Sequence, residues 1–295
     1  MTSERILDIA DSPAGLRIRH EQLVLKTQDR EASIPLAELA VLVVSHPQVT
    51  YTQPVLAGLV EHGAALIVCD RRHMPAGMLL PVEGHHLQAE RFDTQAHASL
   101  PTRKRLWQQI VRAKIKAQAR LLDRINGKDF GLSGLVRRVR SGDPQNVEAT
   151  AARRYWTALF GKGFRRNRDA EDHNRNLNYG YAVLRAAVAR GICAAGLHPS
   201  LGLHHHNRYD AFCLASDLAE PFRPVVDGAV HEWVSRRGTK AAFDKSAKEH
   251  LLNALTARYN LRGEWRTLFD IVARTAVTLA HVFEGNRKAL ELPEI

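Results

Sequence analysis

The sequence has 295 residues, a formal net charge of +11 and a pI near 9.9. Hydrophobic residues make up 45% and charged residues 25%, a composition that excludes a disordered chain. No run of about 18 apolar residues is present, so we expect no transmembrane helix, and the N-terminus lacks the pattern of a secretory signal. The three cysteines form no CxxC pair, which argues against a disulfide framework and predicts a reducing, cytoplasmic location.

The positive charge is concentrated in the middle of the chain. The net charge is −4 in residues 1–100, +13 in residues 101–170 and +2 in residues 171–295. A basic block of this kind attracts a polyanion such as nucleic acid. It is equally typical of a solvated helical surface, so charge alone leaves both interpretations open.

The first 80 residues predict short strands. Branched apolar residues alternate with polar ones or form continuous runs, and two of these runs, 39–45 and 64–70, are typical of strands buried on both faces. Gly63 ends a helix predicted between these two runs. In chain order, the expected elements are strands at 6–10, 16–20, 22–27 and 39–45, a helix at 52–61, and strands at 64–70 and 77–81.

From about residue 85 the pattern becomes helical. The segment 103–125 places apolar residues at three-to-five-residue steps, which predicts one basic helix with an apolar stripe. Further helices are expected at 144–160, 174–196, 209–235, 240–258 and 263–284. We therefore predict an α+β fold with a small β-rich domain at 1–85, a connector at 86–98 and a larger all-α domain at 99–295.

Acidic residues are scarce in the basic block. Asp143 followed by proline is the signature of a helix start, with Asp143 as N-cap, and it puts Glu148 in the second turn of that helix. Glu148 shares a helical face with Ala, Tyr and Leu side chains. A carboxylate on such a face is either a metal ligand or paired with a base such as Arg153 or Arg154.

A second cluster follows at His204–His206, Asp217 and Glu220. Asp217 and Glu220 are three residues apart on a predicted helix and so point the same way. Two neighbouring carboxylates repel unless a proton or cation lies between them. With an imidazole such as that of His205 they suit Mg²⁺ or Mn²⁺. The alternative is a polar turn whose carboxylates pair with nearby arginines such as Arg223.

Several of these motifs together resemble a known family, the spacer-acquisition integrase and endonuclease that is the first protein of CRISPR systems. The resemblance runs from about residue 5 to residue 285 and is closest to the II-C group of the type II branch. The segments that carry it are 146–156, 177–205 and 216–227, supported by 69–81 and 105–119.

The resemblance implies a β-sandwich-like N-terminal domain for dimerisation and partner contacts, followed by a helical catalytic domain. It implies Glu148, His205 and Glu220 as ligands of Mg²⁺ or Mn²⁺, with Asp217 as a further catalytic residue. It also implies a homodimer that assembles with a small ferredoxin-like second Cas protein and binds double-stranded DNA. A contact with the type II RNA-guided effector nuclease is implied as well, and no association with a membrane is expected.

The reaction implied is joining of the 3′-hydroxyl ends of a short duplex to the repeat of a CRISPR array. Basic side chains would position the phosphates without reading sequence; the candidates are Arg153, Arg154, Lys162, Arg165, Arg166, Arg168 and Arg223. Two alternatives remain open at this stage. One is a metal-dependent nuclease in which water attacks at the same site, and the other is a non-catalytic nucleic-acid-binding scaffold.

Overall fold

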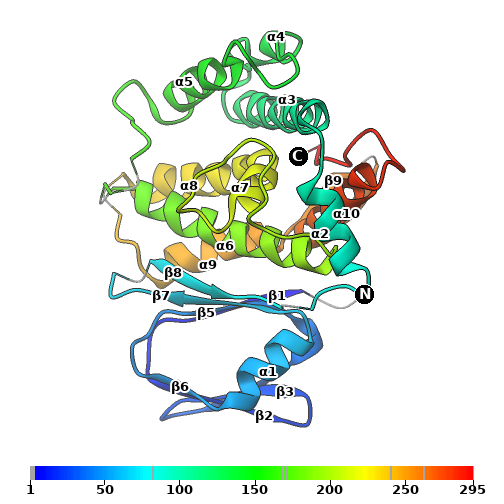
Figure 1. The fold of residues 1–295 in the computed structure, drawn as a ribbon. Coiled ribbons are helices and arrows are strands. Elements are labelled where there is room, and N and C mark those ends of the chain that lie inside the picture. Colours follow the sequence, from blue (N-terminus) through cyan, green and yellow to red (C-terminus); the bar gives the residue numbers. More distant parts are fainter. Residues whose placement is uncertain are drawn as a thin grey trace.

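The computed structural model describes residues 4–72, 74–81, 83–167, 169–170, 172–239, 241–261 and 263–294. Two sheets form the lower part of Figure 1, and layers of helices lie above them. This arrangement confirms the predicted α+β class, with strands first and a mostly helical remainder. No helix in the described ranges is long and apolar enough to cross a membrane.

The N-terminal part contains two sheets and one α-helix. In chain order its elements are β1 (Arg5–Ile9), β2 (Ala14–Arg19), β3 (Gln22–Lys26), β4 (Glu31–Pro35), η1 (Leu36–Glu38), β5 (Leu39–Val44), β6 (Val49–Tyr51), α1 (Gln53–Glu61), β7 (Ala65–Cys69) and β8 (Pro75–Leu79). The first sheet has the strand order β1-β5-β7-β8, and the second has the order β4-β3-β2-β6. The short strands β4 and β6 were not predicted from the sequence.

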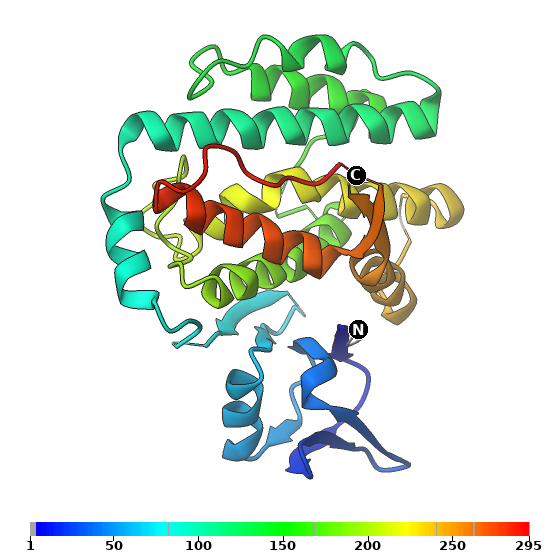
Figure 2. The ribbon, with the colours of Figure 1, turned by 90° about the vertical axis from the view of Figure 1, so that its right-hand side faces the viewer.

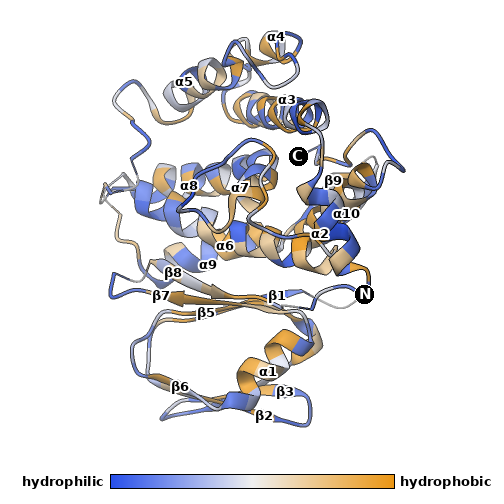
Figure 3. Cartoon of the chain, viewed as in Figure 1, coloured by the Kyte–Doolittle hydropathy of each residue, from blue (hydrophilic) through white to orange (hydrophobic). Residues whose placement is uncertain are grey.

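The centre of the first sheet is covered on both faces, which explains the apolar character of β5 and β7 in Figure 3. All six residues of β5 are buried. Leu42 and Val44 pack in the core between the two sheets, whereas Val41 and Val43 pack in the core shared with the helices. Burial on both faces is confirmed for β5 but only for the first half of β7, because Val68 is 42% exposed.

The helical part begins after β8. Its elements are α2 (Gln88–Ala96), α3 (Leu100–Asn126), α4 (Leu132–Val136), α5 (Val147–Phe160), α6 (Asn174–Ala194), α7 (Cys213–Ala219), η2 (Glu220–Phe222), α8 (Arg223–Arg237), α9 (Lys245–Thr256), β9 (Arg258–Leu261), β10 (Glu264–Thr267) and α10 (Leu268–Phe283). The long helix α3 crosses the top of the helical layers, and α4 and α5 lie above it (Figure 2).

Four features of this part differ from the sequence prediction. The short helix α4 lies in a segment for which no helix was predicted. The expected connector 86–98 contains helix α2. The expected all-α domain includes an antiparallel hairpin, β9–β10. The single helix expected at 209–235 is divided into α7, η2 and α8, because Pro221 and Pro224 lack the N–H groups that a continuous helix needs.

A buried polar cluster joins the first sheet to the helices. Asp8 of β1 accepts a hydrogen bond from the Tyr179 hydroxyl of α6 at 2.9 Å, and it pairs with the Lys248 ammonium of α9 at 3.2 Å. Ser45, just after β5, donates to the other Asp8 oxygen at 3.1 Å. We call Asp8, Ser45, Tyr179 and Lys248 the interface cluster. It satisfies the buried Asp8 carboxylate from both parts of the molecule.

Candidate active site

Glu148 lies in the first turn of α5, where two side chains cap the helix. Asn146 is the N-cap and accepts from the N–H of Ala149, so the prediction that Asp143 is the N-cap is wrong by three residues. Asp143 still serves the helix start, because its two oxygens accept from the N–H groups of Val147 and Glu148 at 3.0 and 2.9 Å. These bonds fix the backbone from which the Glu148 side chain projects.

Glu220 lies at the junction between α7 and α8. It begins the 3₁₀ turn η2, and only 6% of its surface is exposed. One carboxylate oxygen pairs with Arg223 at 3.0 Å, as one of the two sequence interpretations expected. The division of the predicted long helix therefore turns a buried carboxylate toward α3, which packs against η2.

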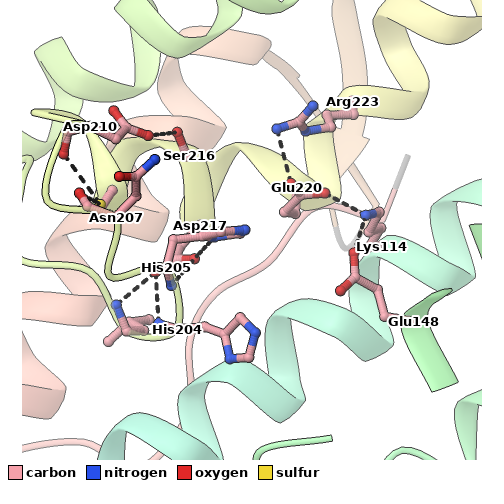
Figure 4. Close-up of polar contacts among 12 residues, drawn as sticks. Lys114, Glu148, His204, His205, Asn207, Asp210, Ser216, Asp217, Glu220 and Arg223 are labelled. Carbon is pink, nitrogen blue, oxygen red and sulfur yellow. Dashed lines mark hydrogen bonds and ion pairs between the residues drawn. The ribbon is translucent and has the colours of Figure 1, made fainter. Parts of the chain in front are cut away.

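Lys114 of α3 lies between the two glutamates (Figure 4). Its Nζ is 2.5 Å from Oε1 of Glu148 and 2.6 Å from Oε2 of Glu220. The sequence analysis did not single out Lys114, although a signal was present. Four-residue steps from Leu106 through Ile110 reach Lys114, which places this lysine on the apolar face of a basic helix. A lysine on such a face is buried only with a carboxylate partner.

The charges in this group reinforce one another. Burial raises the pKa of Glu220, but the positive charges of Arg223 and Lys114 outweigh burial and hold that pKa at about 2. Burial also lowers the pKa of Lys114, and the carboxylates of Glu220 and Glu148 more than offset it. Glu220 is therefore ionised and Lys114 protonated at neutral pH. We call Lys114, Glu148, Glu220 and Arg223 the site cluster.

Asp217 holds the histidine loop against α7. This carboxylate is fully buried and accepts from the backbone N–H groups of Leu203 at 2.7 Å, His204 at 3.0 Å and His205 at 3.3 Å. It also contacts Nδ1 of His205 at 2.5 Å. This bond raises the pKa of His205, and the nearby charges of Glu220 and Glu148 act in the same direction. Asp217 is therefore placed to orient the His205 ring.

Trp107 of α3 supports the other side of the loop. Its buried indole stacks on the ring of His204, with centroids 4.2 Å apart and the planes 1° from parallel. It meets the His205 ring edge-on at 5.7 Å. The His204 ring is thus held in a stacking contact with Trp107, whereas the charges of Glu220 and Glu148 act on the ring of His205. The rotation of both rings is limited by contacts from α3 and α7.

The side chains of Glu148, His205 and Glu220 are of types that bind divalent cations, although the three do not converge on one point. No three His, Cys, Asp or Glu side chains gather tightly enough to hold a metal ion among the described residues. The ammonium of Lys114 instead lies between Glu148 and Glu220, within 2.6 Å of an oxygen of each. Two carboxylates that converge on one cationic nitrogen, beside an imidazole held by a third carboxylate, provide ligands suited to Mg²⁺ or Mn²⁺.

A further buried carboxylate, missed by the sequence analysis, ties the elements of the site together. Asp227 of α8 accepts hydrogen bonds from the hydroxyls of Tyr155 on α5, at 2.8 Å, and of Tyr181 on α6. Burial raises the pKa of Asp227 to about 6, in spite of these bonds. Because α5 carries Glu148 and α8 follows Glu220, this contact fixes the two glutamates relative to each other.

The predicted phosphate-binding residues divide into two groups. Arg153 and Arg154 are exposed on α5, and Lys162 and Arg165 are exposed in the segment that follows it. Arg168 lies outside the described residues. The remaining two contact the protein interior: Arg166 donates to Asn174 and Asn178 at 3.0 and 2.5 Å, and Arg223 pairs with Glu220 and lies over the Tyr181 ring.

Comparison with known proteins identifies relatives over nearly the whole chain. A family model described as "CRISPR associated protein Cas1" matches residues 7–265. The CRISPR-associated endonuclease Cas1 of Neisseria meningitidis serogroup C (strain 8013) is 39% identical over 284 residues, which cover 95% of this chain and 93% of that protein. These matches confirm the resemblance noted in the sequence.

Solved structures share the fold at lower identity. A casposase bound to an integration product aligns with a TM-score of 0.81 at 18% identity, over 97% of this chain and 92% of that one. A chain of a Cas6-RT-Cas1–Cas2 complex aligns with a TM-score of 0.76 at 18% identity, over 99% of this chain and 36% of that one. Both alignments span the sheets and the helices.

Proposed function

The chain belongs to the Cas1 family of CRISPR-associated proteins, and on that premise we propose that it is a metal-dependent DNA integrase of CRISPR adaptation. It joins the 3′-hydroxyl ends of a short duplex to the repeat of a CRISPR array by transesterification. The observation that carries the proposal is the convergence of Glu148 and Glu220, from two different helices, on one cation position beside His205.

Glu148, His205 and Glu220 are the residues that would hold Mg²⁺ or Mn²⁺. The chemistry that such an ion would supply is a lowered pKa of the attacking hydroxyl and stabilisation of the charge that develops on the phosphate. Asp217 accepts a hydrogen bond from Nδ1–H of His205, which leaves the lone pair of Nε2 for a ligand. Arg223 pairs with Oε1 of Glu220, and its positive charge helps to keep this buried side chain ionised.

The exposed basic residues next to Glu148 extend the site into a DNA platform. Arg153 and Arg154 lie one to two turns along the same helix, and Lys162 and Arg165 follow its end. Phosphate contacts from such residues position a duplex without reading its sequence. Arg166, Arg168 and Arg223 belong to the same proposal, with Arg223 acting from within the site cluster.

The proposed partners are those that the resemblance to the family implies. We assign dimerisation and contacts with a ferredoxin-like second Cas protein to residues 1–85, and catalysis to residues 99–295, with 86–98 between them. The Cas1–Cas2 complex among the structures with this fold supports such an assembly. A homodimer and a contact with the type II effector nuclease complete the set of proposed partners.

The test is a joining assay with the purified protein and its second Cas partner. A labelled duplex with free 3′-hydroxyl ends is incubated with a supercoiled plasmid that carries the CRISPR repeat, with Mn²⁺ or with excess EDTA. We expect covalent transfer of the label to the plasmid with Mn²⁺ and none with EDTA. Duplex with blocked 3′ ends is the matched control and should not be joined.

The alternatives give different products in the same assay. Plasmid that is cut but carries no label indicates a nuclease, an activity supported by the name of the N. meningitidis relative. Duplex binding without joining or cutting, in Mn²⁺ and with the partner present, indicates a scaffold. Joining that continues in EDTA contradicts the role proposed for Glu148 and Glu220.

A further inference from the structure

Lys114 distinguishes this site from a simple set of metal ligands. Its ammonium contacts Glu148 at 2.5 Å and Glu220 at 2.6 Å, and both oxygens belong to side chains expected to hold the ion. We propose that Lys114 is a resident counter-cation, which holds the two carboxylates together in the metal-free protein and leaves the position between them when a divalent ion binds. This inference rests on the proposed function, because it takes the bound ion to be a divalent metal.

The two glutamates need a cation between them in the absence of metal. Glu220 is buried, and a second carboxylate close by would raise the cost of keeping both ionised. Arg223 pairs with Oε1 of Glu220, whereas Oε2 pairs with Lys114 and forms no ion pair with any other basic side chain among the described residues. Without Lys114, this buried oxygen would therefore have no partner of opposite charge within the described chain.

The same geometry makes Lys114 the group that must move. A metal ion that binds both glutamates requires the position between their oxygens, which one nitrogen now fills. Lys114 is in the middle of α3, with its backbone held in the helix, so the change is confined to its flexible side chain. Arg223 contacts the other oxygen of Glu220, Oε1, and can keep this contact.

A second buried lysine provides a matched control. Lys248 also projects from a helix, and its side chain is 7% exposed, against 11% for Lys114. Its ammonium pairs with one carboxylate, that of Asp8 at 3.2 Å, and contacts Ser45 at 3.4 Å. Lys248 belongs to the interface cluster and not to the site, so its removal tests the loss of a buried lysine as such.

The experiment measures Mn²⁺ binding to the full-length protein without DNA, by the decrease of the free Mn²⁺ signal in electron paramagnetic resonance. The variants are Lys114→Met, Lys248→Met and the double variant Glu148→Gln/Glu220→Gln, each checked by circular dichroism. We expect Lys114→Met to bind at least about tenfold more tightly, because the site no longer has to be vacated first and carries one more net negative charge. Lys248→Met should bind like the wild type.

The outcomes separate the inference from the proposed function. Unchanged or weaker Mn²⁺ binding by Lys114→Met, with wild-type binding that depends on the two glutamates, overturns only the role of Lys114. If the wild type binds no Mn²⁺ in a glutamate-dependent manner, the metal-dependent function fails together with the inference. Tighter binding by Lys248→Met as well would also contradict the role of Lys114, because it would show a general electrostatic effect.

Chemical labelling of the wild type covers the case in which Lys114→Met does not fold. Acetylation of individual lysines by an excess of acetylating reagent is followed by mass spectrometry, with and without saturating Mn²⁺. We expect the labelling rate of Lys114 to rise several-fold with Mn²⁺, because the ammonium no longer pairs with either carboxylate, while that of Lys248 stays constant. A Lys114 rate that does not respond to bound Mn²⁺ overturns the inference.

Discussion

Among the described residues, two buried clusters are built around a lysine, and they differ in their exposure to solvent. In the interface cluster, Lys248 and Asp8 have side chains that are 7% and 8% exposed, and hydroxyls of Ser45 and Tyr179 complete the contacts of Asp8. In the site cluster, Lys114 shares two carboxylates, and that of Glu148 is 26% exposed. A closed cluster with one pair of charges stabilises the fold, whereas an open one with two carboxylates can exchange its cation.

The largest expected effect breaks the open cluster. Glu148→Gln removes one of the two carboxylates that would hold the metal ion, and the joining rate should fall by about 10³-fold, because a charge-stabilising ligand is worth several kcal/mol. Since Glu148 is partly exposed, we expect the unfolding free energy to change by only about 1 kcal/mol. Timed joining assays and urea denaturation measure the two effects. A variant that joins DNA at the wild-type rate would show that Glu148 is not part of the active site.

The next effect breaks the closed cluster and should have the opposite pattern. Lys248→Met leaves Asp8 buried and unpaired, and the free energy of unfolding should fall by about 3 kcal/mol. At 20 °C, where the variant remains folded, the joining rate should stay within about threefold of the wild type. Urea denaturation provides the measurement. Asp8→Asn/Lys248→Met, which removes both charges, should recover part of the loss, and equal stability of the single and double variants would count against the pairing.

A third effect concerns Asp227, which joins α5 to α8 beneath the site. Its pKa is about 6 in the folded protein, against an ordinary value of 3.8. The folded state therefore binds this proton more readily than the unfolded chain does, and the contribution of Asp227 to stability declines as the pH rises from about 4 to 6. The free energy of unfolding of Asp227→Asn, relative to that of the wild type, should therefore rise by about 2 kcal/mol between pH 4.5 and pH 7.5. Denaturation of both proteins at several pH values tests this, and a constant difference would contradict the raised pKa.

The smallest expected effect concerns the exposed arginines of α5 and the salt dependence of duplex binding. Arg153→Gln/Arg154→Gln removes two exposed charges beside Glu148, and the logarithmic slope of duplex affinity against salt should decrease by about one for each phosphate that these arginines neutralise. Arg17→Gln/Arg19→Gln, on the N-terminal domain, is the matched control and should leave the slope unchanged. Binding isotherms at four or five salt concentrations suffice. Equal slopes in all three proteins would exclude α5 from the DNA contact.

Much of the site was predictable because its carboxylates are unusual in their local sequence. Glu148 stood out as one of few acidic residues in a basic block, and Asp217 and Glu220 stood out by their spacing. Lys114 did not stand out, because one lysine among many basic residues on α3 is conspicuous only through its position on the apolar face. Its importance depends on contacts with α5 and η2, which are distant in the sequence.

The fold shows the same limit. The strand β5 was predictable because burial on both faces leaves a continuous apolar run. The hairpin β9–β10 was not, since its strands are only four residues each and lie directly between two helical patterns. The division of α7 from α8 was marked in the sequence by Pro221 and Pro224. Apolar spacing on both sides continued the helical pattern across these prolines, and so the prediction joined the two helices.

The last turn of α7 contains Asp217, which holds the histidine loop, and leads directly into Glu220 at the start of η2. Asp217 and Glu220 are three residues apart, so His205 and Glu220 are mounted on one rigid unit, and Glu148 on another. Both units rest on α3, which provides no expected ligand. The spacing of the proposed ligands therefore depends on the packing along α3 as well as on the contacts of Asp227. Mutations at that contact would tune which ion the site prefers while every ligand stays the same.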